Sequence, residues 1–216
     1  MSRSRLRRFN GVYILTDRHS SILALERQGF RPSLYGTRVW QSSFWLIDYL
    51  ANNPIAPDRR VVEVGCGWGL VGIYCAKAFA ARVLLTDADD QIFPYVMAHA
   101  QLNGVSVETE RAAFDAIADD HLQGCDVLLG GDICFWPQLG SQLRRLLERA
   151  AGLGVGRIVL ADPGRTTFMR MAESCQRTLG AQLIEWRATT RAGSTGHLLV
   201  LDRDRRLDRS GIASLP

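Results

Sequence analysis

Arg60-Val-Val-Glu-Val-Gly-Cys-Gly-Trp-Gly-Leu-Val-Gly72 is the stretch that decides the fold. The apolar residues 61–64 predict a short buried strand, and the alternating glycines after them predict a tight turn. Small and apolar residues without proline over 70–80 predict a helix. A strand, a glycine turn and a helix in this order bring the N–H groups of a helix N-terminus beside a bound ligand.

A second apolar run, Arg82 to Thr86, predicts another strand, which ends in Asp87. A carboxylate at this place can accept hydrogen bonds from both hydroxyls of a ribose. Gly67 to Gly72 also satisfies the G-x-G-x-x-G dinucleotide pattern, which expects an acid about 20 positions further on. However, Glu63 lies inside the strand, where a carboxylate needs a polar or cationic partner. This acid and the early first glycine of E-x-G-x-G-x-G favour a different nucleoside cofactor. A nicotinamide or flavin site, and a glycine turn that only packs a helix on a sheet, remain alternatives.

Length and composition fit one globular domain: 216 residues, 47% hydrophobic and 22% charged. The run Val12 to Leu15 is too short for a signal peptide, and no run approaches the roughly 20 apolar residues that span a bilayer. We therefore expect a cytoplasmic protein without membrane contact, with a mitochondrial presequence as the alternative. Four arginines near the start account for the whole formal charge of +4: Arg3, Arg5, Arg7 and Arg8. We interpret them as a solvated tail, which argues against nucleic acid as a partner.

Cysteine and histidine spacing indicates no metal site. No C-x-x-C pair occurs among the five cysteines, and the four histidines are scattered. We expect reduced thiols in the core.

The rest of the chain alternates strand-like and helix-like segments. Helices are predicted within 35–50 and over 91–103, 137–151 and 167–179, and further strands over 105–113, 126–130, 157–161, 182–190 and 196–202. The link 191–195 is too short for a helical crossover, so the last two strands should be antiparallel. Residues 9–16 could form a strand, and residues 21–28 fit a strand or a helix equally.

This alternation predicts an α/β fold: a Rossmann-like, doubly wound, mostly parallel sheet with a C-terminal antiparallel hairpin. The domain covers residues 37–202, with an N-terminal extension over 1–36 packed on it and a polar tail over 203–216. Ligands bind such sheets at the carboxyl ends of the strands, near the reversal of strand order. That rule selects one rim, made of residues 65–69, Asp87, Phe114 with Asp115, residues 132–135 and residues 162–165.

Three residues near this rim have two readings each. Phe114 could flank an adenine ring or be an ordinary core residue. Trp40, just ahead of the helix that leads to the glycine strand, could form a wall of the cofactor pocket or belong to the core. Asp132 follows the strand beside the glycine strand, so it should face the reactive end of the cofactor; a polar strand cap is the alternative.

Together these motifs resemble a known family. Trp40, Glu63-Val-Gly-Cys-Gly-Trp-Gly69, Asp87 and Asp132-Ile-Cys-Phe135 are similar to the class I, seven-β-strand methyltransferases that use S-adenosylmethionine (SAM). Within that class they resemble the protein lysine methyltransferases, whose post-strand signature is [DE]-x-x-[YF]. Asp162-Pro-Gly-Arg165 is similar to the branch that modifies the electron-transfer flavoprotein β subunit. The similarity covers about residues 35–201. The chain departs from the group at His99, near which asparagine is usual, and at Phe114, which replaces a commoner tryptophan.

The resemblance implies methyl transfer from SAM to an amine, most directly a protein lysine side chain, with S-adenosylhomocysteine as product and no metal. It implies these cofactor-binding residues: Trp40, Glu63, Gly65, Cys66, Gly67, Gly69, Asp87 and Phe114. Asp132 would be catalytic, and Phe135, Asp162 and Arg165 would bind the substrate. We expect a monomer with a protein substrate.

Alternative functions are a small-molecule N-methyltransferase, a SAM-binding module without catalysis, and a nicotinamide-dependent oxidoreductase. Adenine-N6 methyltransferases resemble one another in an Asn/Asp-Pro-Pro-Tyr/Phe motif, which this chain lacks at residues 132–135.

Overall fold

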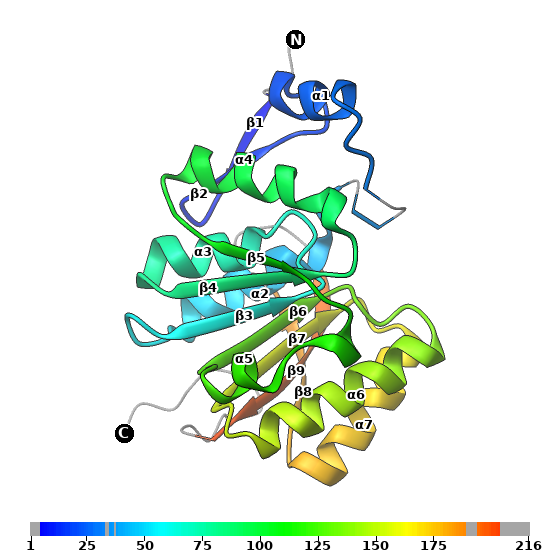
Figure 1. Ribbon diagram of the computed structural model, residues 1–216. Coiled ribbons are helices and arrows are strands. Elements are labelled where there is room, and N and C mark those ends of the chain that lie inside the picture. Colours follow the sequence, from blue (N-terminus) through cyan, green and yellow to red (C-terminus); the bar gives the residue numbers. More distant parts are fainter. Residues whose placement is uncertain (1–4, 33–34, 37, 189–193, 204–216) are drawn as a thin grey trace.

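A computed structural model describes residues 5–32, 35–36, 38–188 and 194–203. Within them, seven strands form one sheet in the order β5-β4-β3-β6-β7-β9-β8 (Figure 1). The strands are β3 (Arg60–Val64), β4 (Arg82–Asp87), β5 (Glu108–Arg111), β6 (Val127–Gly131), β7 (Arg157–Asp162), β8 (Gln182–Arg187) and β9 (Thr195–Asp202). β3 to β7 are parallel, while β9 runs antiparallel to both β7 and β8. The predicted fold class is confirmed.

Helices cover both faces of this sheet. On one face lie α2 (Gln41–Asn52), α3 (Leu70–Phe79) and α4 (Phe93–Asn103), and on the other lie α5 (Asp119–Gln123), α6 (Pro137–Gly152) and α7 (Thr166–Leu179). The buried side chains accordingly form two clusters, one on each face. β4 and β6 lie on opposite sides of β3, so strand order reverses at β3. This is the point where doubly wound sheets bind ligands.

Some predicted boundaries differ from the structure. The helix expected from residue 91 starts as a 3-10 turn, Asp90–Ile92, before α4, and the strand expected over 105–113 is limited to β5. A 3-10 turn, Phe114–Ala116, and the short helix α5 were not predicted. Residues 189–190, most of the link 191–195, the tail 204–216 and Arg3 lie outside the described residues.

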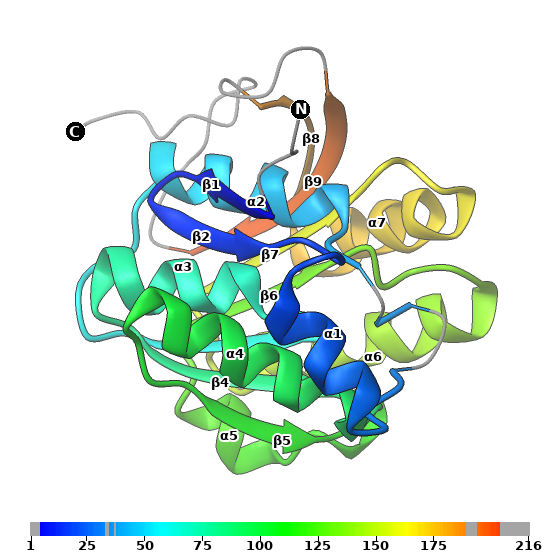
Figure 2. The same ribbon diagram turned by 90° about the horizontal axis from the view of Figure 1, so that it is seen from above.

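The N-terminal region forms a hairpin and a helix: β1 (Leu6–Phe9), β2 (Val12–Leu15) and α1 (Ser20–Arg27). The single strand expected over 9–16 is therefore wrong, because the chain reverses at Asn10 and Gly11. Both have positive φ, 42° and 83°, as a two-residue hairpin turn requires. β2 packs against α3 and α4, and Figure 2 shows the hairpin running alongside α3.

Candidate functional site

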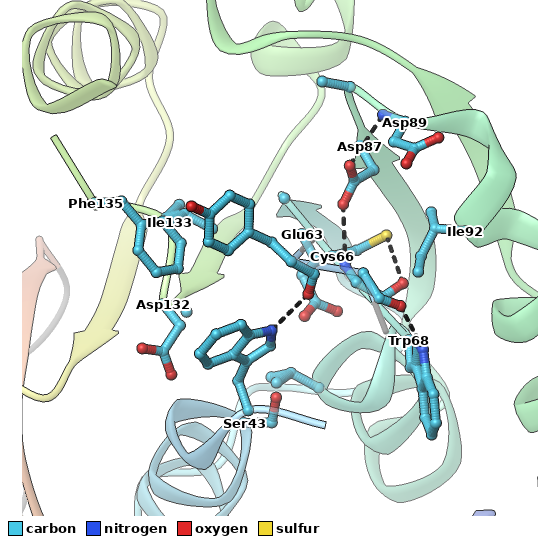
Figure 3. A pocket seen from close by; sticks show the side chains of 18 of the residues that line it. Ser43, Glu63, Cys66, Trp68, Asp87, Asp89, Ile92, Asp132, Ile133 and Phe135 are labelled. Carbon is cyan, nitrogen blue, oxygen red and sulfur yellow. Dashed lines mark hydrogen bonds between the residues drawn. The ribbon is translucent and has the colours of Figure 1, made fainter. Parts of the chain in front are cut away.

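A cavity of about 230 Å³ opens at the carboxyl ends of the strands around β3 (Figure 3). Nine of the residues predicted for the site line it: Trp40, Glu63, Gly65, Cys66, Gly67, Asp87, Phe114, Asp132 and Phe135. In the view of Figure 3, Asp87 and Asp132 lie on opposite sides of the cavity with Glu63 between them. Local patterns had placed these residues at strand ends, and the parallel sheet brings them together.

The glycine turn forms one wall of the cavity. Gly67 has φ +52°, and a Cβ built on it would meet no atom within 4 Å, so its backbone faces open space. Gly65 lies against Ile133, whose Cγ2 would be 2.6 Å from a Cβ. Gly69 does not line the cavity. It caps α3 with φ +69°, and a Cβ there would meet Leu85 at 2.7 Å, so this glycine allows α3 to approach β4 closely.

Glu63 is a buried acid beside the turn. Its Oε2 accepts a hydrogen bond from the backbone N–H of Gly72 at 2.7 Å. Burial raises the pKa of Glu63 to about 8; the Gly72 hydrogen bond opposes this rise and the negative charge of Asp87 adds to it. The side chain is therefore mostly neutral near pH 7 and would ionise if a cation came to lie against it.

Asp87 connects two loops of the site. Its Oδ2 accepts from the N–H of Gly67 and its Oδ1 from the N–H of Asp89, both at 3.1 Å. Burial raises the pKa of Asp87, and these backbone hydrogen bonds oppose the rise. Nearby, burial raises the pKa of the Cys66 thiol well above its ordinary value, so Cys66 is neutral.

Aromatic rings surround the mouth of the cavity. Tyr35 and Phe135 lie 4.3 Å apart between centroids, Trp40 lies 5.7 Å from Phe135, and Trp136 lies 5.6 Å from Tyr35. The Nε1–H of Trp40 donates to the carbonyl of Tyr35 at 2.7 Å. Tyr35 and Trp136 are 37% and 44% exposed. Sequence reasoning missed both, although each aromatic lies within a few residues of a predicted site residue.

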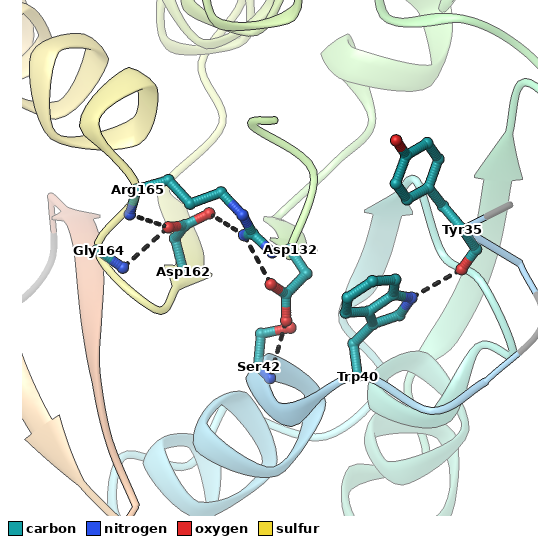
Figure 4. A network of polar contacts seen from close by, with 7 residues as sticks. All are labelled: Tyr35, Trp40, Ser42, Asp132, Asp162, Gly164 and Arg165. Atoms are coloured by element: carbon teal, nitrogen blue, oxygen red, sulfur yellow. Dashed lines mark hydrogen bonds and ion pairs between the residues drawn. The ribbon is translucent and has the colours of Figure 1, made fainter. Parts of the chain in front are cut away.

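Asp132 is held from three sides. Its backbone N–H donates to the carbonyl of Ala161 at 2.9 Å, and its φ of +58° is rare outside glycine. Its Oδ2 accepts from the N–H of Ser42 in the first turn of α2 at 3.2 Å, and its Oδ1 lies 2.7 Å from Nη1 of Arg165 (Figure 4). Ser42 was not predicted, because no local pattern indicates a contact with a residue 90 positions away.

The other predicted rim residues lie outside the cavity lining. Arg165 contacts two residues that line the cavity, Asp132 and the ring of Phe135, and its Nη1 is also 2.7 Å from Oδ2 of Asp162. Asp115 is half exposed and pairs with Arg145 at 3.1 Å.

His99, the departure noted from the family pattern, belongs to the packing of the N-terminal hairpin. It is fully buried; its Nε2 accepts from the N–H of Leu15 at 3.2 Å, and its Nδ1 lies 2.8 Å from the carbonyl of Tyr95. Burial lowers the pKa of His99 to about 4, so the ring is neutral. One turn later, the amide of Asn103 bonds both the N–H and the carbonyl of Tyr13, at 2.8 and 2.9 Å. The side chains of His99 and Asn103 thus hydrogen-bond the backbone of β2, as a neighbouring strand would.

The described residues contain neither a metal-binding cluster nor a membrane-spanning helix. No group of three or more His, Cys, Asp or Glu side chains there is placed to hold a metal ion. Likewise, none of the helices in the described part of the chain is long and apolar enough to cross a membrane.

Comparisons with known proteins show which family the chain resembles. A family model described as lysine methyltransferase matches residues 18–165. The chain is 26% identical over 138 residues to the electron transfer flavoprotein beta subunit lysine methyltransferase of Danio rerio, covering 63% of this chain and 53% of that protein. It is 34% identical over 116 residues to the protein N-terminal and lysine N-methyltransferase EFM7 of Cryptococcus neoformans, covering 52% and 37%. These matches span about half or less of the relatives' length.

Solved structures share the fold at low sequence identity. A methyltransferase from Pyrococcus furiosus superimposes with a TM-score of 0.59 at 17% identity, covering 87% of this chain and 98% of that one. The ribosomal protein L11 methylase of Lactobacillus delbrueckii subsp. bulgaricus gives 0.57 at 18% identity, covering 76% and 79%.

Proposed function

The chain belongs to the lysine methyltransferase family, and from this premise we propose that it transfers a methyl group from SAM to the side-chain amine of a protein lysine. The observation that carries the proposal is Asp132: it lines the cavity at the end of the strand beside the glycine turn, with both carboxylate oxygens oriented by donors. In this proposal residues 37–202 are the methyltransferase domain, with 1–36 as an extension packed on it.

The cavity's polar groups fit SAM. Asp87 offers a carboxylate for the ribose hydroxyls, and Phe114 offers an apolar ring for the adenine. Glu63, buried and mostly neutral when alone, could ionise against the ammonium of the methionine portion. The open space beside Gly67 would let the cofactor come close to the backbone of the glycine turn. This order along the cavity leaves the methyl group facing the side of Asp132.

When bound, SAM supplies an electrophilic methyl group. The residues of the chain would align the acceptor and exclude water from it. Such alignment accounts for much of the acceleration in transfer reactions. Asp132 would accept a hydrogen bond from the lysine nitrogen, orient it and assist departure of its proton. The rings of Trp40 and Phe135 would line the lysine's path and favour its positive charge.

Exposed aromatics at the cavity mouth support a protein acceptor over a small amine. Tyr35 and Trp136 are 37% and 44% exposed there, and aromatic residues are enriched in protein interfaces. Action as a monomer in the cytoplasm stays a prediction.

The test is transfer of a tritiated methyl group from SAM to the components of a cell lysate. We expect label in the protein fraction, recovered as methyllysine after acid hydrolysis. Asp132→Asn should cut the transfer by about 10²-fold or more while SAM affinity stays the same, the usual scale for a positioned acid–base group. Label confined to small molecules would identify a small-amine methyltransferase, and tight SAM binding without any transfer would identify a non-catalytic module.

A further inference from the structure

One nitrogen atom joins two buried carboxylates at the rim of the cavity (Figure 4). Nη1 of Arg165 lies 2.7 Å from Asp132 and 2.7 Å from Asp162. The side chains of Asp132 and Asp162 are 3% and 0% exposed, against 25% for Arg165. With both acids ionised, these three groups, which we call the acid pair and its bridge, carry one net negative charge.

The two acids have different remaining contacts. Oδ1 of Asp162 accepts from the N–H groups of Gly164 and Arg165, at 2.9 and 2.7 Å, so this acid is committed to its own loop at the start of α7. Asp132 has one further donor, the N–H of Ser42 at the positive end of α2, and it also lines the cavity. A ligand in the cavity can therefore contact the net negative charge of these groups at Asp132.

Packing fixes the bridge in place. The guanidinium carbon of Arg165 lies 4.3 Å from the centroid of the Phe135 ring, whose neighbours are Trp40 and Tyr35. A planar guanidinium can stack flat on a ring while its N–H groups contact carboxylates in its own plane, a geometry that an ammonium lacks. Arg165 thus links the acid pair to the aromatic wall.

We infer that Arg165 is a positioning residue for the acceptor site: its guanidinium lies between the buried carboxylates of Asp132 and Asp162 and offsets the charge of only one of them, so that one negative charge remains at Asp132 for a cationic amine. This rests on the proposed function, in which Asp132 receives the acceptor. It replaces the expectation that Arg165 and Asp162 contact the substrate directly.

The reason lies in like-charge repulsion in a buried place. Two adjacent carboxylates without a cation cannot both stay ionised near neutral pH, so one takes up a proton. A proton taken up by the acid pair would remove the net charge that the ammonium needs. With Arg165 in place, the three groups carry one net negative charge, which a bound cation neutralises. The site therefore favours a lysine over a neutral hydroxyl or an acidic group as acceptor.

Two other titratable groups face this loop. Cys134 lies near Asp162 and Arg165, and burial raises its pKa to about 12, so it stays a neutral thiol. His197 on β9 packs on Gly164, where a Cβ would lie 2.9 Å from the His197 Nδ1. A measurement that reads only carboxylates separates the acid pair from both.

The test is a titration of the protein labelled with ¹³C at the aspartate carboxyl carbons, read by NMR. The two signals are assigned by their loss in Asp132→Asn and Asp162→Asn. Arg165→Met should raise the pH of the first protonation of the acid pair by about 1 to 3 units, and Arg165→Lys, which keeps the charge, should restore most of it. An unmoved titration in folded Arg165→Met overturns the inference.

The NMR readout needs no acceptor, so it stands apart from the proposed function. If the pH of the first protonation rises in Arg165→Met but the protein never methylates lysine, the role of Arg165 is supported and the proposed function is rejected. If Arg165→Met does not fold, Arg165→Gln, which is polar and also removes the charge, gives the same comparison. Once the acceptor is known, Arg165→Met should lose single-turnover rate at pH 7 and recover it at higher pH, with SAM affinity unchanged. An equal loss at every pH would indicate a structural role only and would also overturn the inference.

Discussion

The carboxylate of Asp87 accepts a hydrogen bond from the backbone N–H of Gly67, 3.1 Å away. The end of β4 therefore holds the glycine turn that follows β3, and the second oxygen of Asp87 holds Asp89 in the same way. The acid proposed for the ribose also shapes the wall against which the cofactor would lie.

Asp87→Ala should weaken SAM binding by about 10- to 150-fold or more. A hydrogen bond to a charged group is worth about 1.5–3 kcal/mol, and the variant also frees the Gly67 N–H. Asp87→Asn keeps one acceptor oxygen, so its SAM affinity should lie between that of the wild type and that of Asp87→Ala. Calorimetry with SAM measures all three proteins, and full affinity in Asp87→Ala would move the ribose contact elsewhere, first to Asp89.

Gly67→Val should abolish SAM binding, because its branched carbons would enter the open space beside the turn. Gly104→Val is the matched control. Gly104 also has positive φ, +67°, and open space around its Cβ, but it caps α4 and does not line the cavity. Both variants should lose similar stability in thermal unfolding. Equal SAM affinity in the two would exclude the turn from the cofactor site.

SAM binding at pH 7 should release close to one proton from Glu63. Its pKa of about 8 means that the free protein holds this proton at pH 7, and pairing with the cofactor's ammonium would favour the carboxylate. Affinity should then fall as the pH drops below about 8. Calorimetry in buffers of different ionisation enthalpy counts the proton, and Glu63→Gln, which corrects for titration of SAM itself, should lack it. An identical count in both proteins would rule out the pairing.

Stability should fall as the pH drops from about 6.5 to about 4, because of His99. The unfolded chain binds a proton at this histidine below about pH 6.5, whereas the folded chain, whose His99 pKa is about 4, does not. The unfolded state is therefore favoured across this window, by about 2 kcal/mol at pH 5. Urea unfolding at pH 7.5 and pH 5 measures the loss, which should be smaller in His99→Asn. The same loss in both proteins would assign it to other groups.

The N-terminal hairpin has a local signal in the sequence at its turn. Asn10-Gly11 is a strong indicator of a two-residue turn, yet residues 9–16 were interpreted as one strand. The helix over 20–27 was ambiguous, because its short apolar pattern fits two periods equally.

The sequence by itself determined the layered α/β fold, the antiparallel C-terminal strands, and most of the predicted residues that line the cavity. These follow from features of neighbouring residues: apolar runs, turn glycines and polar side chains at strand ends, which a parallel sheet must gather on one edge. Only the tertiary structure decided that Asp132 is shared between Ser42 and Arg165, that Gly69 serves helix packing, and that His99 holds the hairpin. Such contacts join residues far apart in the chain, and they depend on how whole helices and strands pack, which no local pattern encodes.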